Sequence, residues 1–548
     1  MLVDMRVALL SLVICACSFP RPPEIVDDAQ LPSPDAGPIA TDFAVTLASP
    51  RVRIVEGTSA TVEVTIGRNE FTEPVTVTVG GLPAGVTVSP LTIAADSGTL
   101  TLDVAAGATQ GDAALTVTAT GGARAHDAAL SLLAMGLPGT LDKSFATGGI
   151  LMTPPTGFGT AMVIQPDGKI VIAGHTTGTT PDLLVARFLP GGALDPAFAG
   201  GVVTLASPGM NDRANAMTLQ PDGKIVVVGE TFATDENARS GLVARFKTDG
   251  IPDPAFGTGG RVELDLSAAG HFNRAKAVAV QADGGIVVAG IYELGGSFDP
   301  VVARLAPGGG LDNSFGMNGR VRVPLGSGID GFAALRVQSD GRILAVGTTS
   351  SGTTDLVTLV RLTSGGLLDS TFDSDGKLLI NGWEIGDPID DWQTAIAFQP
   401  DGKIVVAGSA WSGAGFDACL LRVNSNDGSP DAGFGTNGVK VVSLAPGHLD
   451  RLTGLALQPD GKLVLGGSVP IAAGSTNYDA VAARFSSEGV LDFGFGAGGI
   501  ATHELGGDVN ATDQPRAIAL DADGRIVTGG FSLAAPGPEQ LLLARFWP

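Results

Sequence analysis

Short runs in which apolar and polar residues alternate fill most of this 548-residue chain, and each run is bounded by Gly, Pro or Asp. Alternation with a period of two places one face of a strand against a core and the other toward solvent, so the pattern predicts β-strands. No amphipathic helical window stands out after the N-terminal leader. The fold class is therefore expected to be all-β.

One stretch, QPDGKIVIAG at residues 165–174, organises the larger part of the chain. Six related copies follow, at residues 220–229, 281–290, 338–347, 399–408, 458–467 and 521–530, the last beginning with Asp instead of Gln. The Asp of the turn recurs every 55 to 63 residues. A recurrence of this period predicts a repeat architecture.

Each repeat has four strand-like segments in a constant order. A Gly-bounded strand comes first, followed by a short strand that ends in Gln, the Lys-Ile-Val-Val strand, and a strand ending Ala-Arg-Phe or similar. Asp-Gly supplies the conformation for a tight hairpin between the second and third segments. Four short antiparallel strands repeated seven times predict a seven-bladed β-propeller of four-stranded blades.

The phase of the repeat also predicts how the ring closes. The small-residue strand ending in Gln is placed innermost, and the polar Gly-bounded strand is placed outermost in the preceding blade. Residues 149–153 should then pair with the strand that holds Arg545 and complete the last blade. This N-terminal strand would close the propeller, which spans residues 137–548.

The repeat resembles a named family. Its opener, Leu-Asp-x-Ser-Phe-Gly-x-x-Gly, its Gln-Pro-Asp-Gly-Lys turn and its Ala-Arg-Phe strand are similar to delta-60 repeats, a bacterial propeller repeat of uncharacterised function. The resemblance covers about three quarters of the chain. It implies a propeller and no activity.

An Arg and an Asp recur at the end of each repeat, eight residues apart in five repeats and nine apart in a sixth. The pairs are Arg187 and Asp195, Arg245 and Asp253, Arg304 and Asp312, Arg361 and Asp369, Arg422 and Asp431, Arg484 and Asp492, and, across the closure, Arg545 and Asp142. We interpret them as structural ion pairs that stabilise each turn. Removal of one member of a pair is expected to destabilise the fold. The recurring phenylalanines beside them are expected to pack in the core.

The two variable loops of each repeat are expected on one face of the ring, where binding residues concentrate. Eight residues before the end of each inner strand stand, after Gly157 in the first repeat, Asp212, Asn273, Asp330, Asp391, Asp450 and Asp513. One hypothesis is a ring at the channel mouth that captures a hard cation such as calcium or a cationic ligand. The favoured alternative is that each Asp caps its own turn.

Other candidate chemistry is sparse. Trp383, Trp392 and Trp411 fall in or near the variable loops of one part of the ring, where they could contact sugars or peptides, or pack between loops. No histidines have metal-ligand spacing, and no nucleophile elbow, phosphate loop or dinucleotide fingerprint is present. We identify no catalytic residue and no cofactor, and any metal is left unknown.

Residues 41–135 have a different pattern, with five alternating strands at residues 43–47, 60–66, 75–79, 99–104 and 114–119. Short antiparallel strands in about ninety residues predict a small β-sandwich. The stretch GLPAGVTVSP at residues 81–90 resembles a motif of bacterial immunoglobulin-like modules, which implies a spacer or adhesion unit.

The N-terminus predicts export. An apolar run follows Arg6 and has the length of a signal peptide. It ends at Cys15-Ala16-Cys17. It resembles the bacterial lipoprotein box, so residues 1–17 would be a lipoprotein signal with Cys17 acylated; Ser18 then implies the outer membrane. The alternative is an ordinary signal peptide and a secreted protein. Residues 18–40, rich in Pro and Asp, are expected to form a disordered tether.

Charge limits the partners. The chain carries 56 acidic and 33 basic residues, a net charge of -23. Such a field disfavours nucleic acid and anionic lipid, so membrane contact is expected only through the N-terminal lipid, and a monomer is expected. The partner would be an unidentified protein or glycan.

Two functions remain open. The first is a lipid-anchored envelope protein, on the periplasmic or cell-surface side, whose propeller acts as a non-catalytic binding or scaffolding module. The second is a glycan-active hydrolase or lyase that uses carboxylates at the propeller mouth. A carboxyl with a raised pKa in a deep pocket would favour the second.

Overall fold

The computed structural model describes residues 41–548 except 234–238, 265–272, 295–296, 327–329, 352–353, 381–393, 412–414, 446–449, 473–474, 476, 506–511 and 534–537. These residues form 36 strands and no helix, which confirms the all-β prediction. Within them, no helix has the length and apolar composition needed to cross a membrane. The predicted signal with Cys17 and the tether at residues 18–40 lie outside this part of the chain.

The first nine strands form two sheets around one core. One sheet has the order β1-β3-β7-β5 and the other β2-β9-β8-β4-β6. The strands are β1 (Asp42–Leu47), β2 (Arg51–Val55), β3 (Thr58–Asn69), β4 (Val75–Gly80), β5 (Val86–Val88), β6 (Leu91–Ile93), β7 (Ser97–Val104), β8 (Gly111–Gly121) and β9 (Arg124–Met135). Alternate residues of β3 and β8, such as Val64 and Val117, are buried in the shared core. All five strands predicted from alternation are present.

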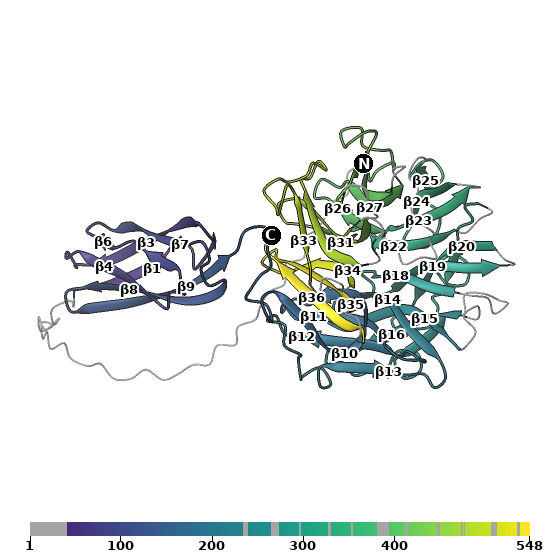
Figure 1. The fold of residues 1–548 in the computed structure, drawn as a ribbon, viewed down its shortest axis with the longest axis horizontal. Helices are drawn as coiled ribbons and strands as arrows, with labels where there is room; N and C mark the ends of the chain where they lie inside the picture. The colour runs from purple at the N-terminus through teal and green to yellow at the C-terminus, as the bar shows by residue number, and fades with distance from the viewer. Residues whose placement is uncertain are drawn as a thin grey trace, which may run out of the picture.

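The repeat region consists of strands that pair in the order in which they follow along the chain. Five sheets have four strands each, and one sheet has seven. Seven strands, which we call the first strands, lie innermost, and the seven-stranded sheet contains two of them, β10 and β34. They are β10 (Ile150–Ile164), β14 (Asn211–Leu219), β18 (Asn273–Val280), β22 (Gly331–Val337), β26 (Ala395–Phe398), β30 (Arg451–Leu457) and β34 (Thr512–Leu520). Each of these contacts the next, and β34 contacts β10, so they surround a common centre (Figure 1).

The remaining strands lie progressively farther from that centre. The second strands are β11 (Ile170–Thr176), β15 (Ile225–Phe232), β19 (Ile286–Leu294), β23 (Ile343–Ser351), β27 (Ile404–Trp411), β31 (Leu463–Pro470) and β35 (Ile526–Leu533). The third are β12 (Leu183–Phe188), β16 (Arg239–Phe246), β20 (Ser297–Leu305), β24 (Thr354–Leu362), β28 (Phe416–Val423), β32 (Tyr478–Phe485) and β36 (Gln540–Phe546). The outer strands are β13 (Val202–Leu205), β17 (Arg261–Leu264), β21 (Arg320–Arg322), β25 (Lys377–Ile380), β29 (Val439–Val442) and β33 (Ile500–His503).

The long strand β10 joins the two ends of the repeat region. Its first part pairs with β36, with Ile150 opposite Ala544 and Thr153 opposite Leu541, and its second part pairs with β11. The amide of Arg545 also donates to the carbonyl of Gly149, at 3.0 Å. The predicted pairing of residues 149–153 with the strand that holds Arg545 is therefore confirmed.

Hydrophobic cores fill the spaces between neighbouring sheets. The second strands are apolar on both faces because a sheet covers each side, and Ile225 to Val228 are at most 1% exposed. The recurring phenylalanines, Phe145, Phe198, Phe256, Phe315, Phe372, Phe434 and Phe495, are all fully buried. Their predicted role as packing residues is confirmed.

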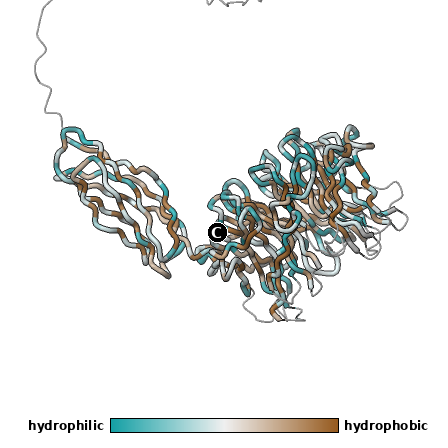
Figure 2. Tube along the Cα trace, turned by 90° about the horizontal axis from the view of Figure 1, so that it is seen from above, coloured by the Kyte–Doolittle hydropathy of each residue, from teal (hydrophilic) through white to brown (hydrophobic). Residues whose placement is uncertain are grey.

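The N-terminal sheets lie against the last repeat, beside the C-terminus (Figures 1 and 2). The indole of Trp547 is fully buried and donates to Gln110 Oε1 at 3.0 Å. The guanidinium groups of Arg51 and Arg53 each lie 2.9 Å from Asp523, in the last Asp-Gly turn. The apolar and charged contacts together connect the two parts of the molecule.

Candidate functional site

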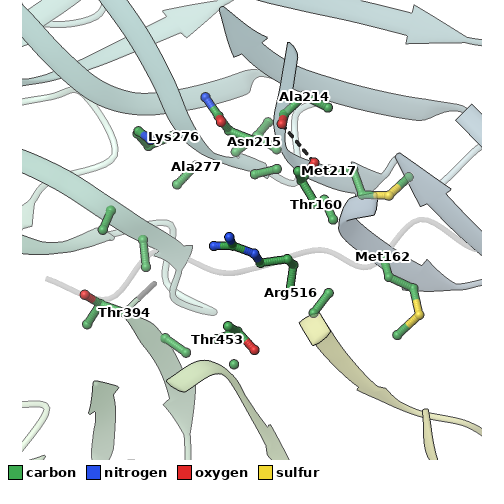
Figure 3. Close-up of a pocket in the computed structure, with 18 of the residues that line it drawn as sticks. Thr160, Met162, Ala214, Asn215, Met217, Lys276, Ala277, Thr394, Thr453 and Arg516 are labelled. Carbon is green, nitrogen blue, oxygen red and sulfur yellow. Dashed lines mark hydrogen bonds between the residues drawn. The ribbon is translucent and has the colours of Figure 1, made fainter. Parts of the chain in front are cut away.

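The seven first strands enclose a pocket of about 510 Å³ at the common centre of the repeat region (Figure 3). Every one of these strands contributes lining residues. A second pocket of about 450 Å³ adjoins it and shares Phe158, His175 and Arg213. The space falls within the range usual for small-molecule sites, so we call the first cavity the axial pocket.

A β-bulge at the same position in the first strands turns extra side chains into the axial pocket. In β10, Gly159 pairs with Gly174 and Ala161 with Ala173, so Thr160 has no residue opposite. Equivalent register shifts occur in β14, β18, β22, β30 and β34. The seven residues at this position, five before the final Gln or Asp, are Thr160, Asn215, Lys276, Ala333, Thr394, Thr453 and Arg516. A bulge re-aims a side chain in this way.

The bulge explains the last Gly of the repeated motif. A Cβ on Gly229 would lie 1.8 Å from the carbonyl oxygen of Arg213, and the same conflict arises at Gly290 with Arg274. Gly174, Gly347, Gly467 and Gly530 meet the corresponding carbonyl at 1.7–2.2 Å. Only a residue without a side chain permits this approach. The sequence contained this signal as a recurring Gly, but alternation alone does not predict a bulge.

Polar side chains at the bulge link neighbouring first strands. Thr160 Oγ1 donates to the carbonyl of Ala214 at 2.8 Å, drawn in Figure 3, and Asn215 Nδ2 donates to that of Ala275 at 3.0 Å. These bonds satisfy carbonyl groups that the bulge leaves unpaired within a ladder. The bulge residues therefore contribute both to the frame and to the pocket wall.

The axial pocket is rich in cationic groups. Its lining includes Arg213, Lys276, Arg336 and Arg516, whereas Glu230 is its one acidic residue. Figure 3 shows Arg516 extending into the space between β14 and the first strands opposite. The guanidinium of Arg516 donates to Gln514 Oε1 at 2.8 Å.

Four of the predicted carboxylates are described, and none of them lines the axial pocket. Asp450 is fully buried, and its carboxylate accepts the amides of Leu444 at 2.7 Å and Ala445 at 3.3 Å. Burial and, to a lesser extent, the charge of Asp417 raise the pKa of Asp450 to about 6, although the backbone hydrogen bonds oppose this shift. Its raised pKa therefore belongs to a loop-capping group and not to the pocket.

The other three carboxylates are held in a similar way. Asp513 accepts the amide of Leu505 at 2.7 Å. Asp212 pairs with Arg261 at 2.8 Å, and Asp330 accepts the hydroxyl of Thr349 at 2.7 Å. All three are at most 1% exposed. Asp513 thus caps its own loop as Asp450 does, whereas Asp212 bonds to an arginine and Asp330 to a threonine hydroxyl of a neighbouring strand.

The other sequence candidates for ligand contact are not placed by the structure. Asp391, Trp383 and Trp392 lie outside the described residues, and for Asn273 and Trp411 only the backbone is described. Within the described ranges, no three or more His, Cys, Asp or Glu side chains are grouped as a metal site would require. The aromatic residues found at the pocket are instead Phe158 and Phe531, whose rings are 4.8 Å apart.

Comparison with protein families identifies the repeat. A model described as "Domain of unknown function (DUF5122) beta-propeller" matches six segments, residues 165–198, 220–256, 281–315, 338–372, 399–434 and 458–495. Each matched segment runs from the Asp-Gly turn through the recurring Arg, Asp and Phe of its repeat. The chain is a β-propeller repeat protein. The family description assigns this propeller no activity.

Other comparisons add little to the propeller assignment. The crystal structure of the polysaccharide lyase Uly1 has a TM-score of 0.39 and 9% identity, over 74% of this chain and 92% of that one. A quinonprotein alcohol dehydrogenase-like protein from Bacteroides thetaiotaomicron has a TM-score of 0.27 and 13% identity, over 71% and 94%. These likenesses are too low to carry an argument about function. A comparison with curated protein sequences gives no match.

The predicted Arg and Asp pairs all meet in the propeller. In each of the seven, Arg Nε lies 2.7–2.9 Å from the Asp Oδ2. The guanidinium also lies 4.5–5.0 Å from the centre of the recurring Phe ring. The closing pair, Arg545 and Asp142, follows the same pattern although 403 residues separate its members. We call these seven groups the Arg–Asp staples.

The staples do more than the sequence predicted, because six of them are seen to reach the next sheet. Arg187 Nη1 donates to the carbonyl of Thr248 at 2.6 Å, and Arg545 Nη1 donates to that of Pro190 at 2.7 Å. The equivalent groups of Arg245, Arg304, Arg361 and Arg422 donate to Pro307, Ser364, Ser425 and Ser487. Each such guanidinium therefore fastens its own turn and the neighbouring sheet together.

Proposed function

We propose that this protein is exported, anchored to the outer membrane by lipid on Cys17, and uses its propeller as a non-catalytic binding module. The lipid would be the only membrane contact, and residues 18–40 would hold the folded part away from the bilayer. A secreted form without the lipid is the alternative for its location.

The architecture behind this proposal is seven four-stranded blades. In this count β10 serves twice, as the outer strand of the last blade and the inner strand of the first. The N-terminal sheets would be an immunoglobulin-like spacer, so that the leader, tether, spacer and propeller occupy residues 1–17, 18–40, 41–135 and 137–548. The repeats would be of the delta-60 type.

The observation that carries the proposal is a difference between constant and variable positions within one chain. Seven repeats keep the staple Arg and Asp, the packing Phe and the motif Gly. The bulge position that faces the axial pocket instead holds Thr, Asn, Lys, Ala or Arg. A rigid frame that presents differing side chains around one cavity is how a scaffold supports recognition.

The partner would be a protein or a glycan that presents a small group to the pocket. The proposed function requires no cofactor, and calcium remains a candidate bound ion. Nucleic acid is disfavoured by the net charge of -23. We expect the protein to act as a monomer.

The alternative, a glycan-active hydrolase or lyase, would need free carboxylates in the pocket. Asp212, Asp330, Asp450 and Asp513 are bonded within the protein, and Glu230 is paired with Arg239 and Arg274. No specific observation therefore favours catalysis over binding.

The decisive experiment is a glycan and peptide array probed with the purified chain, with and without calcium. We expect a defined ligand that binds without being cleaved. Turnover of that ligand, measured by mass spectrometry of the products, would replace binding with catalysis.

Lipid anchoring is tested separately by Cys17→Ser, with Cys15→Ser as the matched control. We expect Cys17→Ser alone to abolish labelling with a fatty-acid analogue and to release the protein from the membrane fraction. Labelling that survives this substitution would refute anchoring at this residue.

A further inference from the structure

The axial pocket has a charge opposite to that of the chain as a whole. Four cationic side chains and one acidic side chain line it, in a protein whose net charge is -23. Charges of one sign in a narrow cavity with protein walls concentrate the electrostatic field. The pocket is therefore a local attractor for anions inside a molecule that repels them elsewhere.

The one acidic residue of the pocket does not cancel this charge. Glu230 lies 2.5 Å from Arg239 and 3.0 Å from Arg274. Neither of these arginines is part of the pocket lining. Glu230 is thus already shared between two cations outside the pocket, and the cations inside it keep their excess.

The propeller frame does not require cations at these positions. Lys276 and Arg516 occupy the bulge position, where the other repeats have Thr, Asn or Ala. Arg336 lies two residues before Gln338, which begins the repeated motif. At the position of Arg336 the other repeats have Val163, Thr218, Ala279, Ala397, Ala456 and Ala519. The same strand geometry forms with neutral side chains, so these three charges are additions to the frame.

Arg336 is the group most in need of a counter-charge. Its Nη1 donates to the carbonyl of Leu335 at 3.2 Å, and no ion pair of Arg336 occurs among the residues the structure describes. The Arg336 side chain is exposed to the channel, and the protein surrounding the channel lowers the pKa of its guanidinium, with no acidic group opposing the shift.

The geometry points to an oxyanion site in the axial pocket, formed by Lys276, Arg336 and Arg516 and completed by the hydroxyl group of Thr394. Guanidinium groups bind carboxylate and phosphate oxygens through paired N–H donors, and an ammonium adds a point charge. Hydroxyl groups donate to further oxygens or to sugar hydroxyls. The ligand class is a small carboxylate- or phosphate-bearing molecule, or such a group on a larger glycan. This inference deepens the proposed binding function and rests on it.

The test is isothermal titration of the full chain with citrate and with inorganic phosphate, against sodium chloride at equal ionic strength. We expect saturable binding of at least one oxyanion. Arg336→Met, Arg516→Met and Lys276→Met should each weaken it by about tenfold or more, because each removes a charged donor. Arg124→Met, on the exposed end of β9, is the matched control and should change the affinity less than twofold.

The two anions separate the sources of the ligand. Binding of citrate alone supports a carboxylate ligand, and binding of phosphate alone supports a phosphate ester. Absence of saturable binding to either, or equal loss in Arg124→Met, would overturn the inference. Thermal melting provides a second measurement: citrate or phosphate should raise the Tm of the native chain but not of Arg336→Met, even if the variants bind too weakly for calorimetry.

Failure of this inference is distinguishable from failure of the proposed function. A neutral glycan or peptide found on the array, whose binding citrate does not inhibit and Arg336→Met does not weaken, would overturn the oxyanion site and leave the binding module in place. Oxyanion binding that depends on Arg336, without any array ligand, would support the site and argue against a macromolecular partner.

Discussion

Arginines occur in two contrasting settings in this propeller, the Arg–Asp staples and the axial pocket. The staple Arg187 has a carboxylate at 2.8 Å, a Phe ring at 4.6 Å and a carbonyl of the next sheet. Arg336 in the pocket has one carbonyl of its own strand. The first kind of charge is neutralised where it lies and holds the frame together. We propose that the second kind contacts the charge of a bound ligand.

The acidic residues show the same contrast. Burial acts to raise the pKa of the staple carboxylate Asp253. The amide of Ala255 and the charge of Arg245 outweigh burial and lower this pKa below its usual value. The bonds to Asp450 come from backbone amides, the charge that acts on it is that of Asp417, and burial raises its pKa. Desolvation acts on both, and the presence or absence of a partner of opposite charge decides the direction. A partner of opposite charge therefore distinguishes the staple carboxylates from the loop-capping carboxylate of Asp450.

Removal of the closing carboxylate should have the largest effect. In Asp142→Ala, the buried Arg545 loses its partner, and an uncompensated buried charge costs about 3–5 kcal/mol. We expect a large fall in Tm and in the urea midpoint. Asp312→Ala is the matched control, because the Asp312 side chain is 29% exposed and water can solvate what remains. Equal losses in the two variants would break the distinction between buried and exposed staples.

The pH dependence of stability should separate Asp450 from the staples. The folded pKa of about 6 exceeds the ordinary value of 3.8, so the stabilisation is complete below pH 3.8 and is lost as the pH rises through 6. From pH 4 to pH 7, Asp450→Asn should gain roughly 3 kcal/mol in unfolding free energy relative to the native chain.

The control for this titration is Asp96→Asn, since the Asp96 side chain is 85% exposed. Its stability relative to the native chain should stay flat over the same range. Asp253→Asn should behave in the opposite sense: a lowered folded pKa contributes stability that is lost only as the pH falls below the ordinary range. A flat difference for Asp450→Asn in urea titrations would show that the carboxyl is not desolvated.

The close approach at the bulge is tested by Gly229→Ala. A Cβ placed 1.8 Å from the Arg213 carbonyl oxygen must displace backbone, with an expected cost of about 1–3 kcal/mol. Gly191→Ala is the control, because nothing lies within 4 Å of its Cβ, and its Tm should be nearly unchanged. A neutral Gly229→Ala would mean that the frame can relax at the bulge.

The smallest effect is expected for Arg336→Met without any anion. Because the Arg336 side chain is exposed to the channel and has no ion-pair partner among the described residues, its replacement should change the unfolding free energy by less than about 0.5 kcal/mol. The same change at a staple, Arg187→Met, should destabilise it, because Asp195 is left alone. Thermal melts in chloride buffer measure both. A loss of stability in Arg336→Met would assign this arginine to the frame.

The staple contacts could be predicted from the sequence because they recur within it. An Arg and an Asp recur eight residues apart in five repeats and nine apart in a sixth, and an unmatched Asp142 and Arg545 stand at the two ends. This recurrence indicates both the pairing and the closure. The predicted channel-mouth carboxylates were placed by the same kind of counting. The favoured interpretation, that each Asp caps its own turn, holds for Asp450 and Asp513, which accept the amides of Leu444 and Leu505. The count could not predict that Asp212 pairs with Arg261 of the outer strand, 49 residues away.

By itself, the sequence determined the all-β fold, the order of strands in each repeat, and the pairing of residues 149–153 with the last strand, because alternation, turn residues and repeat phase are local properties. Only the tertiary structure decided what lies at the centre. Lys276, Arg336 and Arg516 come from three repeats up to 240 residues apart, and a bulge, which no alternation pattern encodes, turns two of them inward. Strand patterns follow from neighbours along the chain, whereas the charge of a pocket depends on which strands meet in space.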